Sequence, residues 1–475
     1  MKKTTLLIIL AGLLFCAALF PASCGQEGDK KEGDADAFTQ ALEDAGFSFQ
    51  EGKLGAVDVF ALVEAGVFAN CNYQNAGAAY LTPKLPPAPG QEAPCYFTDA
   101  AVNPGDEGLF LDYRLRSDEA VVLVGKTPPK CTYFGYDGNI ATRWSEQTGK
   151  PVVLFGNYGD PLNPMVIKTD GSQDDPYEKN TMIIMSADRG VNESIRAAAE
   201  DAGYSPDIIN DYVIPSQLLK LGLDQGSDTL VLLHRFAYPD DEQAGQAYLD
   251  DPTMSVFRVT PNESPEPDMY EMPECRVRGT GDFRELELSD TLEELRQAII
   301  NRYPDLAAQD FTSGSWGADG LDAIQKMQSG LGPGRDALYM KTDQFTLADD
   351  PDEFVIAYGI NHAALDKATY NSISVYGTVK ANGVASAWNG MYAGTAEEYL
   401  PGDPNAQYLY VWKFARNANG DPDVTEVPWN QGIMGIDLDQ PMFLGFRLYL
   451  EPETKTGPVI NELYYDRAIK FSSKQ

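Results

Sequence analysis

The sequence contains little histidine and little positive charge. Its 475 residues include 2 His, 36 Lys and Arg, and 71 Asp and Glu, which gives a formal net charge of −35 at pH 7. A zinc site built from several histidines is therefore excluded, because a site with only two would already use both. Nucleic-acid binding needs a surface rich in Lys and Arg that displaces counterions from phosphates, so we expect no nucleic-acid partner.

Three glycine-containing motifs are also missing. The sequence has neither GxGxxG nor GxxxxGK[ST], so it gives no basis for a nucleotide cofactor. It also lacks the GxSxG nucleophile elbow, and a Ser-His-Asp triad would have to use one of the two histidines. Carboxylates are so frequent that close pairs arise by chance, and they do not indicate glycoside hydrolysis.

The sequence does contain enough apolar material for packed cores. Hydrophobic residues make up 43% of the chain and aromatic residues 11%, with 43 Gly and 31 Pro. This composition excludes global disorder, and the many Gly and Pro favour strands and turns over a helical bundle. The length indicates two or three domains.

The N-terminus has the parts of an export signal. Lys2 and Lys3 precede an apolar stretch from Leu6 to Phe20, which is too short for a comfortable membrane span. Residues 22–25 then read ASCG. With this ending the segment resembles the signal peptide of bacterial lipoproteins, although Pro21 stands where a Leu-like residue is usual.

The resemblance implies that the chain is cut before Cys24 and that this cysteine carries a lipid. The membrane would then be a partner through the lipid anchor, and the protein would lie outside the cytoplasm, in the bacterial cell envelope. The polar residues 24–38 would form a disordered tether. Ordinary secretion with cleavage nearby and a retained membrane anchor are the alternatives.

Four further cysteines are Cys71, Cys95, Cys131 and Cys275. An even number in an oxidising compartment predicts two disulfides, and none of the four forms a CxxC pair typical of zinc or redox sites. We expect Cys71 to pair with Cys95 around a Pro-rich loop and Cys131 to pair with Cys275. Buried free thiols are the alternative.

From about residue 108 onward, short β-branched and aromatic runs alternate with turns, which predicts strands. Two helical patterns interrupt them, at residues 188–202 and 289–304, and Ser289 is the expected N-cap of the second. Another helical segment is expected near residues 36–68.

Two parts of the chain share four short matches in the same order, which predicts an internal duplication. Chance similarity between strands of a Tyr-rich protein is the alternative. The matches are DEAVVLVG (118–125) with DEFVIAYG (352–359), Thr132-Tyr133 with Thr369-Tyr370, LLHRFA (232–237) with YVWKFA (410–415), and Phe257-Arg258 with Phe446-Arg447.

We therefore expect a β-rich α+β fold with two related β-sandwich-like units from an internal duplication. The first unit should carry an α/β insertion at about residues 150–225. The predicted parts are the signal peptide (1–23), the tether (24–38), a helical and Pro-rich segment (39–107), the first β unit with its insertion (108–280), a helical connector (281–335) and the second β unit (336–475).

His362 has the sequence surroundings of a general acid or base. It follows the strand that ends at Gly359, and Lys367 and Tyr370 lie close by. The matching turn of the first copy has no histidine. If the protein is an enzyme, we predict His362 as its acid/base residue, with Tyr370 or Lys367 polarising the substrate. A histidine bonded to the turn backbone is the alternative.

Arg235 and His234 are adjacent in the strand TLVLLHRFAY and point to opposite faces. An arginine among apolar residues needs a partner, or binds a ligand carboxylate through two hydrogen bonds. We predict Arg235, His234 and Asn361 as ligand-binding residues. The alternative is a structural role, which the base Lys413 in the matched strand favours for Arg235.

A loop near residue 420 alternates oxygen-bearing side chains, namely Asn417, Asn419, Asp421 and Asp423. Calcium prefers six to eight oxygen ligands, although this spacing departs from the EF-hand. The loop predicts either a calcium site or a solvated hairpin tip. We expect no other cofactor.

These patterns together favour an exported envelope lipoprotein that acts as a binding or surface module for a small molecule or an envelope polymer. The alternative is an extracytoplasmic hydrolase or lyase with its site around His362. An enzyme should gather His362, Lys367, Tyr370 or Arg235 around one deep cavity, whereas a binding module should scatter them.

Overall fold

The computed structural model describes residues 35–317 and 319–474. The predicted signal peptide, Cys24 and most of the predicted tether lie outside the described residues. Within the two described ranges, no helix is both long and apolar enough to cross a bilayer.

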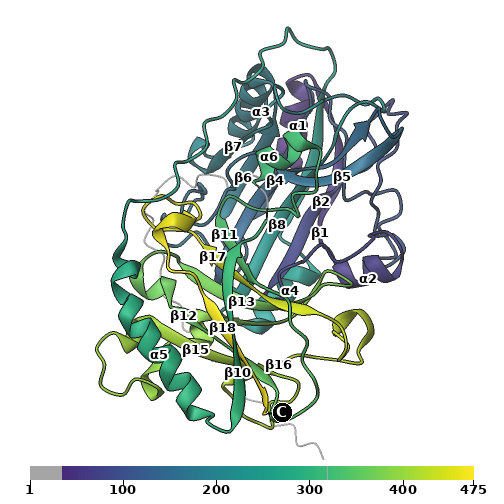
Figure 1. Ribbon diagram of the computed structural model, residues 1–475. Helices are drawn as coiled ribbons and strands as arrows, with labels where there is room; N and C mark the ends of the chain where they lie inside the picture. The colour runs from purple at the N-terminus through teal and green to yellow at the C-terminus, as the bar shows by residue number, and fades with distance from the viewer. Residues whose placement is uncertain (1–34, 318, 475) are drawn as a thin grey trace, which may run out of the picture. The chain divides into compact units, whose positions relative to one another are not determined.

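The first half of the chain forms one nine-stranded sheet, which lies in the upper part of Figure 1. Its last pair, β6 with β7, is parallel, and the other neighbouring pairs are antiparallel. The strands in sheet order are β5 (Lys150–Asn157), β4 (Cys131–Ser145), β8 (Thr229–Pro239), β2 (Ala78–Lys84), β1 (Phe47–Ala56), β9 (Met254–Pro261), β3 (Ala120–Lys126), β6 (Asn180–Ser186) and β7 (Ile209–Val213).

The second half forms another nine-stranded sheet, coloured green to yellow in Figure 1. Its last pair, β15 with β16, is again parallel. The strands in sheet order are β14 (Asn382–Trp388), β13 (Tyr370–Gly377), β17 (Met442–Tyr449), β11 (Ala337–Thr342), β10 (Leu306–Ser315), β18 (Arg467–Ser473), β12 (Phe354–Ile360), β15 (Leu409–Ala415) and β16 (Val424–Glu426).

The two sheets have the same topology. Each strand of the second sheet occupies the place that the strand nine positions earlier in the chain occupies in the first. The parallel pair falls at the same edge in both. The predicted β-rich fold with two related units from a duplication is therefore confirmed.

Two of the four sequence matches join equivalent strands. Residues 118–125 and 352–359 belong to β3 and β12, and the two Thr-Tyr pairs lie at β4 and β13. The other two matches are wrong, because LLHRFA lies in β8 but YVWKFA in β15, and Arg258 lies in β9 but Arg447 in β17. Strands that bury both faces share aromatic and β-branched residues, so short motifs match between strands that are not equivalent.

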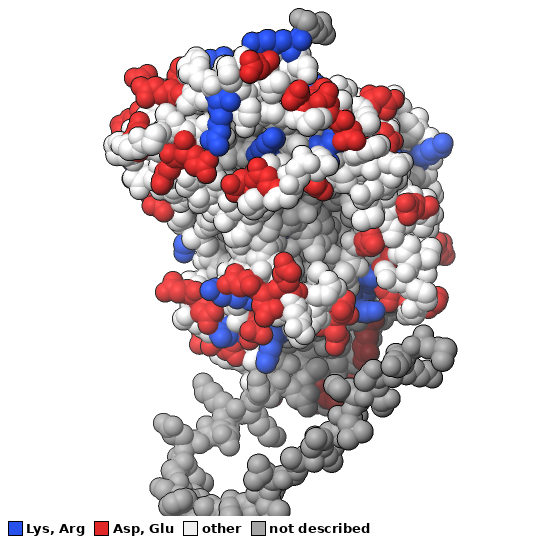
Figure 2. Space-filling view, turned by 90° about the horizontal axis from the view of Figure 1, so that it is seen from below, with Lys and Arg blue, Asp and Glu red and all other residues white. Residues whose placement is uncertain are grey.

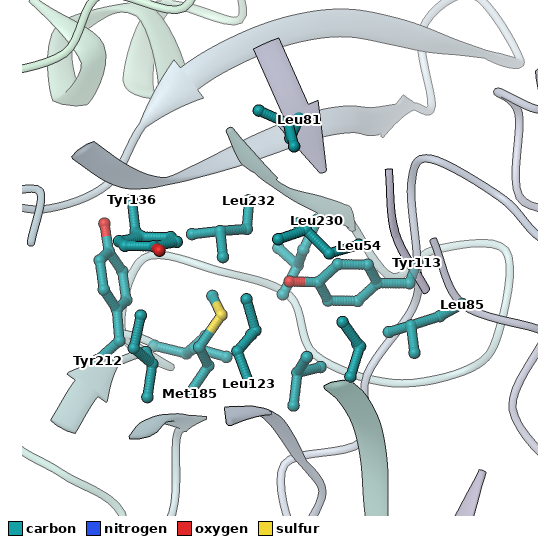
Figure 3. Close-up of a cluster of buried hydrophobic side chains, with 14 of the residues drawn as sticks. Leu54, Leu81, Leu85, Tyr113, Leu123, Tyr136, Met185, Tyr212, Leu230 and Leu232 are labelled. Carbon is teal, nitrogen blue, oxygen red and sulfur yellow. The ribbon is translucent and has the colours of Figure 1, made fainter. Parts of the chain in front are cut away.

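Each sheet curls around its own apolar core. In the first unit the backbone N–H of Gly138 in β4 donates to the hydroxyl of Tyr212 in β7 at 2.7 Å, although these strands lie near opposite ends of the sheet. Figure 3 shows Tyr212 beside Tyr136 of β4 in this core. In the second unit the two edge strands, β14 and β16, contact each other. The two packed layers of each sandwich-like unit thus belong to one curled sheet.

Helices cover the outer face of each sheet in equivalent places. An apolar cluster joins α1 and α3 to β3, β6 and β9, and another joins α5 to β12, β15 and β18. Leu292, Leu295 and Ile299 of α5 are buried, as their spacing indicates. The α-helices of the described residues are α1 (Ala35–Asp44), α2 (Val59–Glu64), α3 (Arg189–Asp201), α4 (Glu242–Asp250), α5 (Ser289–Arg302), α6 (Gly320–Lys326) and α7 (Asn389–Tyr392).

Several predicted boundaries differ from the structure. β1 lies inside the segment expected to be helical, and β10 lies inside the expected helical connector, so both units begin earlier. Leu288 rather than Ser289 caps α5, because Ser289 is already the first helical residue. Within the predicted insertion, the helix α3 has no counterpart in the second unit, because only residues 416–423 join β15 to β16 there. The strands β5, β6 and β7 of the predicted insertion do have counterparts in the second unit.

The predicted disulfides are absent, because Cys71, Cys95, Cys131 and Cys275 are all free. They lie in different surroundings: the backbone N–H of Cys71 donates to Lys380 of the second unit, Cys95 accepts a hydrogen bond from Gln91, and Cys131 belongs to the core of the first sheet. Burial raises the pKa of the Cys71 thiol to about 11.

Candidate functional site

Two connecting segments, called arms below, join the two units. The first arm, residues 57–77, links β1 to β2, and the second arm, residues 316–336, links β10 to β11. Because β10 and β11 are the counterparts of β1 and β2, the arms are equivalent connections. Each arm leaves its own sheet and bonds to the other unit.

The first arm bonds to the hairpin between β13 and β14. The backbone N–H groups of Cys71 and Tyr73 donate to the carbonyls of Lys380 and Ala381, at 3.0 and 2.7 Å. This fixes the first arm to the backbone of the second unit.

The second arm makes the equivalent bonds to β5. The N–H groups of Gly330 and Gly332 donate to the carbonyls of Leu154 and Phe155, both at 2.7 Å. The backbone conformations agree as well, since Tyr73 and Gly332 have φ of 52° and 63° and their acceptors Ala381 and Phe155 have φ of 51° and 41°. The two units therefore exchange arms symmetrically, as the subunits of a twofold dimer do.

Equivalent aromatic side chains meet at the same junction. The rings of Tyr133 and Tyr370, which come from the matched Thr-Tyr pairs, lie 6.1 Å apart. Tyr449 stacks on Tyr370 at 4.6 Å and contacts Tyr133. These residues form one buried cluster that both sheets share.

A cavity of about 400 Å³ is lined by residues of both arms. Most of its lining is apolar or aromatic and comes from both arms and from β5, β8, β11 and β17. Among the described residues, the charged side chains that line it are Arg235 and Arg447, without any Asp or Glu. The outer surface differs, since Figure 2 shows acidic side chains over two regions of one face with a largely uncharged band between them.

The two arginines occupy equivalent positions. Arg235 of β8 lies opposite Gly135 of β4 and Tyr80 of β2. Arg447 of β17 lies opposite Ser372 of β13 and Tyr339 of β11. Gly135 and Ser372 each follow the matched tyrosine, Tyr133 or Tyr370, by two residues. Arg235 thus corresponds to Arg447, and the expected match with Lys413 is wrong.

Each arginine also holds the arm of the other unit. Arg235 donates through Nη2 to the carbonyl of Gly332, and Arg447 donates through Nη2 to the carbonyl of Tyr73 at 3.0 Å. Both side chains are nearly inaccessible, with 4% and 5% of their residue surface exposed. These hydrogen bonds fix the arms at the wall of the cavity.

The counterion of the arginines is where the two units differ. Arg235 donates through Nη1 to the carboxylate of Asp137. Burial raises the pKa of that carboxyl, and the charge of Arg235 opposes the rise. Ser374 of the second unit is equivalent to Asp137 of the first. Asp137 pairs with Leu233, two residues before Arg235. Ser374 pairs with Gly445, two residues before Arg447.

Arg447 therefore has aromatic neighbours in place of a carboxylate. It donates through Nη1 to the hydroxyl of Tyr376. Its guanidinium lies 5.2, 5.6 and 5.7 Å from the ring centres of Tyr376, Tyr339 and Trp316. In the described part of the chain, no Asp or Glu oxygen comes within 4.0 Å of its nitrogens. Its positive charge at the cavity wall is neutralised by no carboxylate.

Tyr339 of β11 is close enough to both arginines to feel their charges. Burial raises the pKa of its hydroxyl, and the charges of Arg235 and Arg447 oppose the rise. Its hydroxyl accepts a hydrogen bond from the backbone N–H of Gly334 at 3.2 Å.

His362, the predicted catalytic residue, is fully buried away from this cavity. Its Nδ1 lies 2.6 Å from Glu285 Oε1, and its Nε2 lies 3.3 Å from Asp466 Oδ2. Burial alone would lower its pKa, but the two carboxylates outweigh burial and raise the pKa to about 10. Both ring nitrogens are occupied, so the arrangement gives no support to acid or base catalysis.

The other predicted catalytic residues are also enclosed. The ammonium group of Lys367 lies 3.0 Å from Glu451 and 2.7 Å from Glu462. Tyr370 is fully buried in the aromatic cluster of the junction. The predicted catalytic residues are thus buried groups, and none of the three lines the cavity between the arms.

Of the three predicted ligand-binding residues, only Arg235 lines the cavity. His234 faces the core of the first sheet, stacks on Tyr136 at 4.2 Å and contacts the hydroxyl of Tyr248 through Nε2 at 2.9 Å. Burial lowers the pKa of His234 to about 3, so it is neutral. Asn361 is buried next to His362, and its backbone N–H donates to Tyr408.

The predicted calcium loop uses its oxygens for turns. Asn417 Oδ1 accepts the backbone N–H of Asn419 at 2.8 Å, and Asp421 Oδ1 accepts that of Asp423 at 3.0 Å. All four side chains are exposed. Within residues 35–317 and 319–474, no group of three or more His, Cys, Asp and Glu is placed to hold a metal ion. The geometry fits the solvated hairpin tip.

Sequence reasoning missed Arg447, Tyr339 and both arms. Arg447 was matched with Arg258, whose strand is not equivalent, and the arms carry no motif. The sequence offered one signal for this pair, because each arginine follows its matched Thr-Tyr pair after a long connection. Each arginine is also followed, two residues later, by a residue of the junction cluster, Ala237 or Tyr449.

No protein-family model matches the chain, and no curated protein is similar to it. Among solved structures it is similar to the crystal structure of the VPA0106 protein from Vibrio parahaemolyticus, with 11% identity, a TM-score of 0.38, and coverage of 93% of this chain and 98% of that one. It is also similar to an uncharacterised protein from Burkholderia cenocepacia, with 10% identity, a TM-score of 0.37, and coverage of 94% and 91%. Similarity this low carries no functional argument.

Proposed function

We propose that the protein is a binding module that holds a small, largely apolar molecule in the cavity between its two units. The observation that supports this is the cavity itself, which has a volume of about 400 Å³ and a mostly apolar and aromatic lining. Small-molecule sites are of this size and composition and commonly lie between domains. The enzyme alternative has no comparable support, because His362 and Lys367 are buried in ion pairs and Tyr370 is buried in the aromatic cluster.

The envelope location is part of the proposal and depends on the N-terminal sequence. The basic residues, the apolar stretch and the ASCG ending support cleavage before Cys24 and attachment of a lipid there. Intact mass and membrane partitioning of the expressed chain test this. A Cys24→Ala variant should leave the membrane fraction, and a wild-type chain that starts at another residue would contradict the proposal.

The cavity is tested by filling it. Val57 of the first arm lines the cavity and is equivalent to Trp316, since their backbone N–H groups donate to the equivalent carbonyls of Tyr80 and Tyr339. A Val57→Trp substitution therefore places a bulky ring where the symmetric arm already carries one. We expect it to weaken binding of the neutral apolar dye N-phenyl-1-naphthylamine by about tenfold or more.

The matched control is Val379→Trp. Val379 is 63% exposed and does not line the cavity. It introduces the same side chain at the surface, so dye affinity should stay unchanged. Equal dye binding by the wild type and Val57→Trp, or no binding by the wild type, would overturn the proposed function.

A further inference from the structure

We infer that the molecule held in the cavity carries one carboxylate or similar anionic group, which binds Arg447. This inference rests on the proposed function and adds the chemical class of the ligand. It follows from a difference in charge between equivalent positions behind the cavity wall, where the first unit has Asp137 and the second has Ser374.

The first unit shows what a buried arginine at this position needs. Arg235 is completed by the carboxylate of Asp137, together with the carbonyl of Gly332. A guanidinium group is always charged, and its removal from water carries a desolvation cost that a close carboxylate offsets. The first unit provides that carboxylate from its own chain.

The second unit keeps the arginine and loses the carboxylate. Ser374 takes the place of Asp137, and its hydroxyl lies 3.2 Å from the hydroxyl of Ser386 and 3.4 Å from Asn75 Oδ1. Tyr376, Tyr339 and Trp316 surround the Arg447 guanidinium at 5.2 to 5.7 Å. Cation–π contacts of this kind attract the guanidinium charge, but they do not neutralise it as a hydrogen-bonded carboxylate does.

A ligand can supply the carboxylate that Arg447 lacks, because Arg447 lines the cavity. Arg235 needs no such ligand, since Asp137 already neutralises it. A carboxylate is planar and can accept two parallel N–H bonds from a guanidinium. The apolar and aromatic lining fits a hydrocarbon or aromatic body attached to that group. The net charge of −35 does not prevent this, since salt screens the surface charges beyond about 8 Å at physiological ionic strength.

The test compares three probes that share one chain: decanoate, decan-1-ol and decylammonium. Calorimetric titration of the purified wild-type protein should give decanoate an affinity about ten- to a hundredfold higher than decan-1-ol, with decylammonium the weakest. Equal affinities for decanoate and decan-1-ol would overturn this inference and leave the proposed function intact. Binding of none of the three probes would contradict the proposed function itself.

Two variants locate the anion. Arg447→Gln removes the charge, and Ser374→Asp supplies the internal carboxylate that the first unit has. Each should bring decanoate down to the affinity of decan-1-ol, while decan-1-ol still binds and so reports an intact cavity. The control Arg467→Gln removes an arginine of β18 that pairs with Tyr464 and Glu293 outside the cavity, and it should keep the preference. A preference for decanoate that persists in Ser374→Asp would overturn the assignment to Arg447.

Discussion

The two units share every strand of their topology but differ in how they treat buried charge. The first unit buries a neutral histidine, His234, and neutralises Arg235 with Asp137. The second buries a charged histidine, His362, between two carboxylates and leaves Arg447 without one. The backbone pattern of a duplicated fold is thus retained, while the buried charges differ: the two histidines lie on strands that are not equivalent, and Ser374 replaces Asp137 at an equivalent position.

The largest effect should come from the two histidines. Replacing His362 by Leu leaves Glu285 and Asp466 buried without their positive partner, so we expect a loss of about 5 kcal/mol in the free energy of unfolding. The matched change His234→Leu removes a neutral hydrogen bond to Tyr248 and should cost about 1–2 kcal/mol. Urea unfolding monitored by circular dichroism measures both. Equal losses would show that His362 is not a structural cation.

The second largest change in the free energy of unfolding should come from exchanging the residues at positions 137 and 374. Asp137→Ser leaves Arg235 buried without a carboxylate and should cost about 3 kcal/mol, because Arg235 has one nearby ring, Tyr80, where Arg447 has three. Ser374→Asp adds a partner for Arg447 and should change stability by no more than about 1 kcal/mol. Denaturant midpoints of the two single variants and of the double variant Asp137→Ser/Ser374→Asp measure these changes in stability. An unchanged denaturant midpoint for Asp137→Ser would contradict the claim that Arg235 needs a carboxylate that Arg447 lacks.

The same two histidines should give opposite pH dependences. The unfolded value is 6.5 for both, and the folded pKa is about 10 for His362 and about 3 for His234. The contribution of His362 is therefore complete below pH 6.5 and is lost as pH rises toward 10. That of His234 is complete above pH 6.5 and is lost as pH falls toward 3, in each case by up to about 1.4 kcal/mol per pH unit.

These slopes are measured as the difference in unfolding free energy between the wild type and each Leu variant across pH. The advantage of the wild type over His362→Leu should shrink as pH rises from 6.5 toward 10. Its advantage over His234→Leu should shrink on the acidic side only. A slope of the same sign for both histidines would contradict the assigned protonation states.

The smallest effect concerns the arms. Gly332 has φ of 63°, a conformation that L-residues adopt at a cost, and its equivalent Tyr73 adopts it at 52°. Gly332→Ala should therefore lower stability by about 1 kcal/mol. The control Gly314→Ala, in β10 with open space and without positive φ, should be close to neutral. Thermal unfolding compares the two, and equal midpoints would indicate that the arm relaxes.

Much of the fold could be predicted from local patterns. The alternating aromatic runs gave the β-rich class, and the matches at β3/β12 and β4/β13 gave the duplication. The helical patterns gave α3 and α5, because their apolar residues recur at helical spacing. The strand β1 was missed, since its residues FSFQEGKLGA contain too few β-branched side chains to signal a strand.

The candidate site was less predictable. Arg235 was correctly singled out as a charge in an apolar strand that needs a partner, but neither Asp137 nor the arm carbonyl at Gly332 could be identified, because both come from distant parts of the chain. His362 was misleading for a physical reason. Its position after a strand looks like an exposed turn, and only the packing of Glu285 and Asp466 from other segments encloses it.

The sequence by itself determined the β-rich class, the duplication and the acidic surface, because these depend on composition, local periodicity and repeated order along the chain. Only the tertiary structure decided which strands correspond, that each arm bonds to the other unit, and that Arg447 rather than Arg235 lacks a carboxylate. The reason is that strand pairing and charge neutralisation join residues far apart in sequence, and strands of similar composition leave their partners undetermined until the sheets close and pack.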